Sequence, residues 1–296
     1  MSVHDPVPPR PRVAVIGAGT MGGAMAARLL SLRFEVRVWS RHAASTVSLV
    51  ELGATGHENV RDAVVEADIV LTTLPTAAVT AEVMFDGLGI DAVPPGATWA
   101  QMATIGVSAT ESVYDVARNR RPDVAFVDAP VSGSRGPAES GQLLILAAGP
   151  DTANPSLKSV FDALGRKTLW LGPVGAGSRM KLILNTWLAF QTECAAESAS
   201  LAKRLHVDPL MLVEALRDNP LASAYAMAKL DRILSDDYHA DFSLDWALKD
   251  LELVGDDAGA DAAPIAAAIA DRWRNLVENG SSGLDVSAAG RGLGEA

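Results

Sequence analysis

Short apolar runs alternate with longer mixed stretches along the first 171 residues of the chain. The apolar runs, which are rich in Val, Ile and Leu, are typical of buried strands, and the mixed stretches predict helices between them. The predicted strands are 13–16, 35–39, a short one near Ala54, 69–75, 98–104, 123–128, 143–148 and 167–171. The predicted helices are 23–30, 43–52, 60–67, 76–85, 107–118 and 155–164. Strands that alternate with helices predict an α/β fold with a doubly wound, mostly parallel sheet.

The pattern changes at Gly175, after which only helices are predicted. They cover 175–205, a stretch that opens at Pro209, 221–234, 244–257, and a stretch from Pro264 to about 280. The second half is therefore expected to be an all-helical domain. The prediction divides the chain into a disordered N-terminal arm (1–12), an α/β domain (13–174), a helical domain (175–280) and a flexible tail (281–296).

Composition and charge exclude several classes of protein. The formal net charge of −11 argues against nucleic acid or an anionic membrane surface as a partner. No apolar run reaches the ~18 residues that a membrane span needs, and the Pro-rich residues 1–12 do not resemble a signal peptide. The single cysteine, Cys194, lies in an Ala-rich helical run and is expected in the core. We therefore expect a cytoplasmic protein. We expect no metal, because no histidine has a second ligand at a metal-binding spacing.

A glycine-rich turn directly follows the first predicted strand and opens an Ala- and Leu-rich helix. Its residues are Gly17, Ala18, Gly19, Thr20, Met21 and Gly22. In this context Gly-x-Gly-x-x-Gly is the fingerprint of a dinucleotide-binding βαβ unit. Gly17 allows the tight turn, Gly19 lets the backbone approach a pyrophosphate, and Gly22 lets the helix pack on the strand. The N-terminus of the helix then offers N–H groups to the phosphates.

The second predicted strand ends at Ser40 and Arg41, where an NAD-binding unit presents an acidic residue. A guanidinium pairs with a 2′-phosphate, which a carboxylate would repel. NADP is therefore the favoured cofactor, and NAD the less favoured one. The alternative is that Arg41 is an ordinary solvated side chain.

Further candidate residues follow predicted strands, where ligands of open α/β sheets bind. Leu74 and Pro75 end one strand, and Thr104 ends the next. A later turn has two hydroxyls and a flexible backbone that could hold a small carboxylate, and its residues are Ser132, Gly133 and Ser134. An ordinary Ser/Gly turn is an equally good interpretation of that stretch.

Two lysines of the helical half are close in sequence to polar residues and are candidate functional residues. Lys181 and Asn185 are four residues apart in the helix 175–205, so they share one face. Apolar neighbours make a charged lysine costly there unless it meets a partner or a cleft, and burial lowers a lysine pKa towards the range of an acid–base catalyst. A surface lysine that extends along the helix is the alternative. Lys249 and Asp250 form a second pair, which alone would be a solvated face.

Four motifs, taken in order, resemble those of the β-hydroxyacid dehydrogenase family over roughly residues 13–257. They are the cofactor signature 17–22, the substrate signature Asp128–Ser134 with 141–143, the catalytic signature 175–185, and Lys249–Asp250. Within the family, the segment 132–149 looks most like the glyoxylate/succinic semialdehyde reductases. The position of Phe242, eight residues before Asp250, also resembles these reductases.

The resemblance implies an NADP-binding Rossmann domain (13–174) followed by a helical substrate and dimerisation domain (175–280). It also implies an NADPH-dependent oxidoreductase that transfers hydride between the nicotinamide and a small aldehyde, keto acid or 3-hydroxy acid. Lys181 would be the catalytic lysine, with Asn185 orienting the carbonyl oxygen and Asp250 assisting. Ser132 and Thr104 would bind substrate and Phe242 would pack on it. Leu74, Pro75 and Lys249 would contact the cofactor.

Some positions depart from the family pattern. Arg33-Phe34 replaces a Gly-containing turn before the second strand, and Arg135-Gly136 replaces a more basic pair, which leaves the identity of the acid open. Imine reductases share the architecture but usually carry Asp or Tyr where this chain has Lys181, so imine reduction is a minor alternative. A non-catalytic NADP-binding scaffold is another, against which the intact Lys181 and Asn185 argue.

The long helix 175–205 is too apolar for one small domain to cover both of its faces, and the resemblance implies dimers or tetramers. We therefore expect a homodimer or homotetramer. The size of the substrate pocket depends on how Trp187 and Trp246 are oriented.

Overall fold

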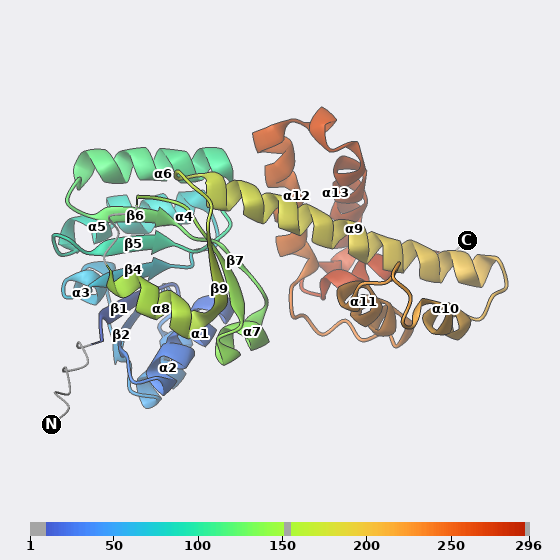
Figure 1. Cartoon of the computed structure of the whole chain (residues 1–296), viewed down its shortest axis with the longest axis horizontal. Helices are drawn as coiled ribbons and strands as arrows, with labels where there is room; N and C mark the ends of the chain where they lie inside the picture. Colours follow the sequence, from blue (N-terminus) through green and yellow to red (C-terminus); the bar gives the residue numbers. More distant parts are fainter. Residues whose placement is uncertain (1–9, 151–154, 294–296) are drawn as a thin grey trace, which may run out of the picture. The chain divides into compact units, whose positions relative to one another are not determined.

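The structure is a computed structural model that describes residues 10–150 and 155–293. The chain forms two compact units, Met1–Lys181 and Leu182–Ala296 (Figure 1). The sequence predicts a boundary at Gly175, whereas the division falls inside one continuous helix, α9 (Ala176–Arg204). The first residues of this helix belong to the first unit because they are hydrogen-bonded to its sheet.

The first unit is built on a six-stranded parallel sheet, as predicted, with the strand order β3-β2-β1-β4-β5-β6. The strands are β1 (Arg12–Ile16), β2 (Glu35–Trp39), β3 (Thr55–Gly56), β4 (Ile69–Thr72), β5 (Thr98–Gln101) and β6 (Ala125–Asp128). Alternate residues of a strand enter different cores: Val13 and Val15 face one, and Ala14 and Ile16 the other. Burial of both faces explains why these strands read as continuous apolar runs.

Helices cover both faces of this sheet (Figure 1). One face packs against α1 (Thr20–Ser31), α2 (Val47–Glu51), α7 (Arg135–Ser140) and α8 (Ser156–Leu164). The other packs against α3 (Val60–Val64), α4 (Ala77–Ala81) with the π-helical turn Glu82–Asp86, α5 (Gly89–Ala92) and α6 (Val107–Arg120). The doubly wound architecture is confirmed.

A second, three-stranded sheet is not predicted by the sequence. It has the order β7-β8-β9 and consists of β7 (Val131–Ser132), β8 (Leu143–Ala147) and β9 (Gly165–Trp170). The sequence assigns the last two strands to the main sheet, which is wrong. The strand β7 pairs antiparallel with β8, and so turns the chain away from the parallel sheet directly after β6. Two residues are too few for a periodic signal.

The second unit is all-helical among the residues that the structure covers, as predicted. It contains the rest of α9, α10 (Pro209–Leu216), α11 (Ala224–Leu234), α12 (Leu244–Ala258) and α13 (Pro264–Leu276), followed by π-helical and 3₁₀ turns at 277–281 and 286–290. Its core includes the fully buried Trp273 and Leu244. The only strand-like pairing described in this unit is an isolated bridge between Ser243 and Asp285.

The predicted flexible tail is wrong for residues 281–293. Val286, Ala288 and Ala289 are fully buried in the core of the second unit. At the other end, Arg12 already belongs to β1, so the predicted arm is shorter than 1–12. The rest of that arm (1–9) and residues 294–296 lie outside the described residues.

Three further findings concern Cys194, membrane-spanning helices and the turn at Arg33. Cys194 is exposed rather than buried, because its Ala-rich helix turns one face to the core and another away from it. No helix in the described parts of the chain is long and apolar enough to cross a membrane. Arg33 adopts a left-handed conformation with φ 64°, which explains why a glycine suits this turn.

Candidate functional site

The glycine-rich turn joins β1 to α1 through very close backbone packing. The Gly17 carbonyl accepts a hydrogen bond of 2.6 Å from the Thr73 hydroxyl at the end of β4. A Cβ on Gly22 would overlap both of those oxygens, so α1 can lie this close to the turn only with glycine there. Gly17 itself has φ +102°, a conformation that L side chains rarely adopt.

The start of α1 is open and electropositive. A Cβ at Gly19 would meet nothing within 4 Å. No side chain caps the helix, and its first turn contains no acidic residue. The first N–H groups of a helix lack partners within the helix, and the helix dipole is positive there. The residues present therefore fit the pyrophosphate of a dinucleotide, with open space at Gly19 where the phosphates would lie.

The end of β2, adjacent to β1, has no carboxylate of its own. Ser40 is half-buried and Arg41 is exposed. The Arg41 guanidinium pairs with Glu82 at 2.7 Å, and both side chains are more than half exposed. Such an exposed ion pair contributes only about 0–1 kcal/mol. Arg41 can therefore exchange Glu82 for a competing anion at low cost.

The loops after β4 and β5 lie at the same edge of the sheet, because β1, β4 and β5 are parallel neighbours. Leu74 is buried against Gly17 and Pro75 is exposed. Thr104 is half-buried in a loop that the buried Gln101 fixes. The Gln101 amide accepts from Thr72 Oγ1 at 2.9 Å and donates to the Ala103 carbonyl at 2.8 Å. The structure thus brings the predicted cofactor residues of the first unit to one edge.

The Ser/Gly turn begins at Ser132, the last residue of β7, and has a constrained shape. Gly133 has φ +135°, and a Cβ there would lie 2.9 Å from Leu143 Cδ2. Ser132 and Ser134 are half-buried on either side of it. Ser134 precedes α7, but its side chain makes no capping hydrogen bond to that helix. The turn thus presents its hydroxyls on a backbone that only glycine can form.

A buried carboxylate fastens the start of α9 to the main sheet. Asp128, at the end of β6, is 1% exposed. It accepts hydrogen bonds from Gly175 N at 3.1 Å, Ser178 N at 2.9 Å and Ser178 Oγ at 2.9 Å. Burial raises the pKa of this carboxyl, and the bonds from Ser178 oppose the rise without cancelling it. The approach is so close that a Cβ on Gly177 would overlap the Leu146 carbonyl.

This anchor was missed as a functional element in the sequence, although Asp128 lies in the substrate signature. Its partners are about fifty positions away, so no local pattern could reveal it. Lys181 is half-buried and lies three residues, or about one helical turn, after Ser178. Asp128 therefore defines where the helix begins and, with it, where Lys181 lies in the first unit.

In the second unit, α9 and α12 join three predicted site residues. The Asn185 amide donates to Asp250 Oδ2, and both side chains are buried. Lys249 Nζ lies 2.9 Å from the other oxygen of Asp250 and 5.6 Å from the centre of the Trp246 ring. One hydrogen bond and one ion pair thus compensate the buried carboxylate, whose charge would be costly alone.

The aromatic candidates of this unit differ in exposure. Phe242 is half-buried in the loop before α12 and packs partly on the helical core. Trp187 is 65% exposed and Trp246 is 43% exposed. Among the residues with described coordinates, no three His, Cys, Asp or Glu side chains are grouped so that they could hold a metal ion.

Comparison with known proteins assigns the family. A family model described as the NAD binding domain of 6-phosphogluconate dehydrogenase matches residues 12–172. The chain belongs to the β-hydroxyacid dehydrogenase family. The helical half of this β-hydroxyacid dehydrogenase, residues 175–293, matches a second model, described as NAD-binding of NADP-dependent 3-hydroxyisobutyrate dehydrogenase.

Individual relatives agree with this assignment over nearly the whole chain. Glyoxylate/succinic semialdehyde reductase 1 of Arabidopsis thaliana is 30% identical over 280 residues, which cover 93% of this chain and 96% of the relative. NAD-dependent L-serine dehydrogenase of Pseudomonas aeruginosa is 29% identical over 290 residues, covering 93% and 95%. The solved structure of Mycobacterium tuberculosis 3-hydroxyisobutyrate dehydrogenase with L-serine has a TM-score of 0.86 at 25% identity, covering 97% and 100%.

These findings confirm the resemblance that the four motifs carry. The protein is an NAD(P)-dependent hydroxyacid dehydrogenase, and its cofactor is a nicotinamide dinucleotide.

Proposed function

We propose that this enzyme is an NADPH-dependent reductase of small aldehydes or keto acids of the glyoxylate or succinic semialdehyde type. It would also oxidise 3-hydroxy acids such as 3-hydroxyisobutyrate. The observation that carries the proposal lies within the first unit. An open phosphate cradle at Gly19 occurs together with Lys181 on a helix that Asp128 fastens to the same sheet. The semialdehyde reductase from Arabidopsis thaliana supports the substrate class by its similarity.

The mechanism divides the work among the residues described above. When bound, the nicotinamide supplies or accepts the hydride. The Lys181 ammonium donates a hydrogen bond to the carbonyl oxygen and then its proton. Asn185 orients that oxygen, and Asp250 in turn fixes the Asn185 amide. The turn at Ser132, Gly133 and Ser134 holds the substrate carboxylate.

Other predicted residues shape the site. Thr104 binds substrate and Phe242 packs on it, while Lys249, Leu74 and Pro75 contact the cofactor. Lys249 would be held for this role by Asp250, which lies 2.9 Å from its ammonium.

The cofactor preference rests on Arg41. An exposed guanidinium in a loop without acidic residues pairs with a 2′-phosphate once Glu82 is displaced. We expect NADPH to give the higher kcat/KM in the wild type and Arg41→Ala to lower it selectively. Equal use of both cofactors by the wild type would contradict this preference.

The substrate class is tested by an activity screen with NADPH and NADH. The panel contains glyoxylate, succinic semialdehyde, 3-hydroxyisobutyrate, L-serine and a cyclic imine. Turnover of a carbonyl acid with NADPH is the expected result. Turnover of the imine alone would favour an imine reductase, and cofactor binding without any turnover would favour a scaffold.

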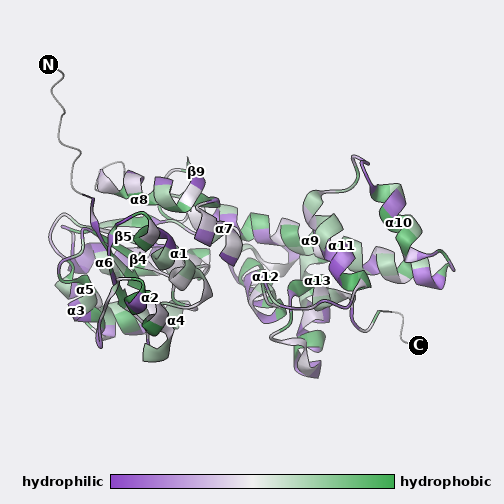
Figure 2. Ribbon diagram, turned by 90° about the horizontal axis from the view of Figure 1, so that it is seen from below, coloured by the Kyte–Doolittle hydropathy of each residue, from purple (hydrophilic) through white to green (hydrophobic). Residues whose placement is uncertain are grey.

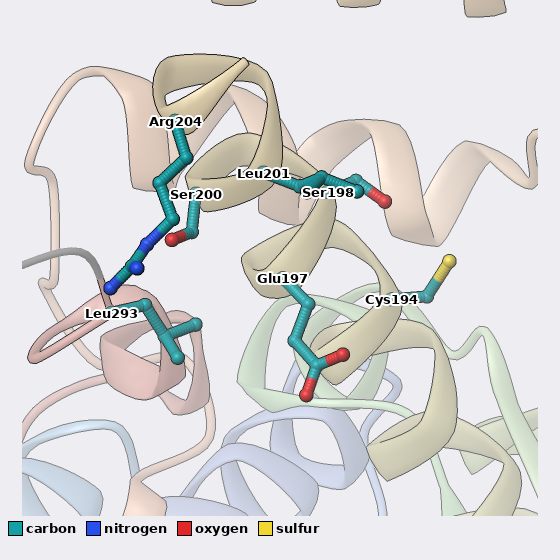
Figure 3. A pocket seen from close by; sticks show the side chains of 7 residues that line it. All are labelled: Cys194, Glu197, Ser198, Ser200, Leu201, Arg204 and Leu293. Atoms are coloured by element: carbon teal, nitrogen blue, oxygen red, sulfur yellow. The ribbon is translucent and has the colours of Figure 1, made fainter.

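We also propose that a second copy of the chain covers an exposed face of the helical unit. The face, here called the α9 stripe, lies at helical spacings of four and seven residues and comprises Ile183, Trp187, Cys194, Leu201 and Leu205. Figure 2 colours much of α9 and α10 as hydrophobic. An open hollow of about 400 Å³ continues the stripe, between Leu201 on α9 and Leu293 (Figure 3). Exposed apolar stripes of this kind mark protein interfaces.

Sedimentation tests this assembly. The protein is expected to sediment as a dimer or tetramer of its 30.9 kDa chain. Leu201→Glu should weaken the assembly, whereas Ile265→Glu, at an exposed position on α13 outside the stripe, should not. A monomer at micromolar concentration would contradict the proposal.

We also propose that the enzyme is located in the cytoplasm.

A further inference from the structure

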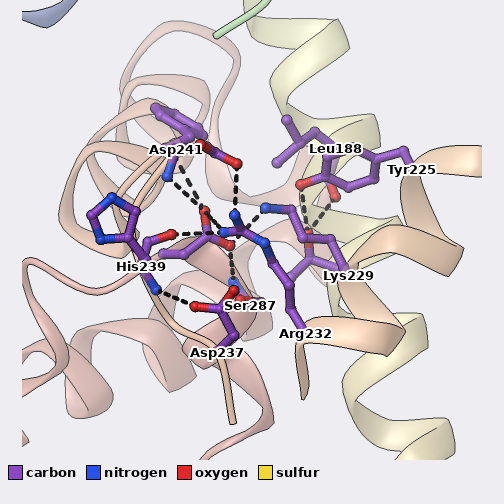
Figure 4. A network of polar contacts seen from close by, with 11 residues as sticks. Leu188, Tyr225, Lys229, Arg232, Asp237, His239, Asp241 and Ser287 are labelled. Carbon is purple, nitrogen blue, oxygen red and sulfur yellow. Dashed lines mark hydrogen bonds and ion pairs between the residues drawn. The ribbon is translucent and has the colours of Figure 1, made fainter. Parts of the chain in front are cut away.

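A buried charge network in the second unit is not used by the mechanism above. Its centre is Asp285, which is fully buried in the segment that the sequence predicts to fray. Lys229 Nζ lies 2.6 Å from its Oδ1, and Arg232 Nη1 lies 3.3 Å from its Oδ2. Figure 4 shows Lys229, Arg232 and Asp241 converging on the centre of the network. The buried ion pair between Lys229 and Asp285 holds the C-terminal segment against α11.

The same carboxylate also binds the loop between α11 and α12. Its Oδ2 accepts from Asp241 N at 3.2 Å and from Phe242 N at 3.3 Å. The Phe242 carbonyl accepts from Val286 N at 2.8 Å. Both backbone polar groups of Phe242 are therefore held by Asp285 and the residue that follows it.

The loop is fixed on both sides of Phe242. Before it, Arg232 donates to the His239 carbonyl at 2.7 Å, and Asp285 N donates to the Tyr238 carbonyl at 2.9 Å. After it, Leu244 N, the first residue of α12, donates to the Leu284 carbonyl at 2.8 Å. The C-terminal segment thus determines the conformation of the loop and the start of the helix that carries Lys249 and Asp250.

The carboxylate is stable as an anion. Burial alone would raise the pKa of Asp285, but bonds from Lys229 and Ser287 outweigh it, so the pKa lies below its ordinary value. Charge-assisted hydrogen bonds are roughly twice as strong as neutral ones. Both oxygens of Asp285 accept hydrogen bonds, so a neutral amide in its place would turn its NH₂ group either toward the N–H groups of Asp241 and Phe242 or toward Lys229 and Ser287 N. In either orientation an acceptor is lost and the network that holds the loop is weakened.

We infer that Asp285 is a positioning residue that fixes Phe242 and thereby sets which length of carbonyl acid the enzyme prefers. The inference rests on the proposed function only for the contact between Phe242 and substrate. The fixing of Phe242 is a property of the described contacts alone.

Two measurements test it on the full-length enzyme. The first is hydrogen exchange of the 238–245 backbone, which Asp285→Asn should accelerate about tenfold or more, as expected for the loss of charge-assisted bonds. The second is the ratio of kcat/KM for glyoxylate to that for succinic semialdehyde. This ratio should change about tenfold, the low end of the discrimination that one methylene provides in an apolar pocket. A ratio is independent of the fraction of folded enzyme.

Control variants separate positioning from general stability. Arg272→Met removes an ion pair with Glu193 and a bond to the Ala289 carbonyl, so it loosens the same segment without touching the loop. It should leave the substrate ratio unchanged. In a Phe242→Ala background, Asp285→Asn should alter the ratio no further, because its effect acts through Phe242.

Each result is decisive. Unchanged exchange in Asp285→Asn would overturn the fixing of the loop. Faster exchange with an unchanged ratio, or a change that persists in Phe242→Ala, would overturn the role in specificity. If Asp285→Asn does not fold, Arg232→Met, at a position 23% exposed, should give the same changes at smaller size. If the wild type reduces no carbonyl acid, the proposed function fails, while the exchange experiment still decides whether Asp285 fixes Phe242.

Discussion

Three glycines of the cofactor turn have different surroundings, so alanine at each should give a different result. Gly22 is the most restricted, because a Cβ there would overlap the Gly17 carbonyl oxygen and the Thr73 hydroxyl. Thr73 is hydrogen-bonded to the Gly17 carbonyl, so neither group can make room for a Cβ unless α1 shifts. Overpacking of this kind costs about 1–3 kcal/mol or more. A unit of this size loses about 2–4 °C in Tm per kcal/mol, so Gly22→Ala should melt roughly 2–12 °C lower.

Gly19→Ala should separate cofactor binding from stability. Its φ of −73° suits any L residue, and a Cβ would meet nothing within 4 Å. The folded protein therefore loses only the better N-cap preference of glycine over alanine. That loss costs about 1 kcal/mol or less. The methyl group would fill the space proposed for the pyrophosphate. Losing one charge-assisted hydrogen bond costs about 1.5–3 kcal/mol, which weakens NADPH binding by roughly ten- to a hundredfold.

Gly23→Ala is the matched control. Its Cβ would lie 3.5 Å from the Ala18 carbonyl oxygen, an ordinary contact, and alanine inside a helix adds about 0.5–1 kcal/mol of stability relative to glycine. Thermal melts and fluorescence titrations with NADPH measure the three variants. The reasoning is refuted if Gly19→Ala binds NADPH as tightly as Gly23→Ala, or if Gly22→Ala melts with the wild type.

Two further predictions concern buried carboxylates. Asn185→Ala removes a hydrogen-bond donor from the buried Asp250, so it should lower the free energy of unfolding in urea by at least about 1–3 kcal/mol. The control Asn275→Ala, at an exposed site, should lower it by almost nothing. Equal losses in the two variants would contradict the pairing. Because its pKa is raised, Asp128 contributes most to folding below the ordinary carboxyl pKa of about 3.9, and this contribution is lost as the pH rises through the folded value. Asp285, whose pKa is lowered, contributes fully above that ordinary pKa, and its contribution is lost as the pH falls through the folded value. The stability difference from the Asn variant, measured by urea unfolding between about pH 3 and 7, should therefore change with opposite sign at the two sites, and slopes of the same sign would contradict the assignment.

The sequence predicts the parts of the molecule whose signals are local. The strand 35–39 and the turn that opens α1 are correct because a few adjacent residues determine them. The small sheet is missed because β7 has only two residues. The segment after Ser281 looks flexible by composition, yet a charge pair with Lys229, 56 positions earlier, holds Asp285 in the core.

The candidate site divides in the same way. The phosphate turn is read from one motif, and Lys181 and Asn185 are related by helical spacing. The pairing of Asn185 with Asp250 spans 65 positions, so family resemblance alone indicated that both belong to one site. The anchoring of α9 by Asp128 has no sequence signal at all, because it depends on where β6 ends in space.

Lys181→Ala tests the central claim most directly, since it removes the proposed proton donor and leaves the turn 17–22 untouched. General acid catalysis is worth about 10²–10⁴-fold. On the best substrate of the screen, single-turnover oxidation of NADPH should slow by that factor, with NADPH affinity and Tm unchanged. Lys181→Arg should also be slow, because a guanidinium keeps its proton. A Lys181→Ala enzyme that retained more than about a tenth of the wild-type rate, where at least ~10²-fold should be lost, would contradict the account.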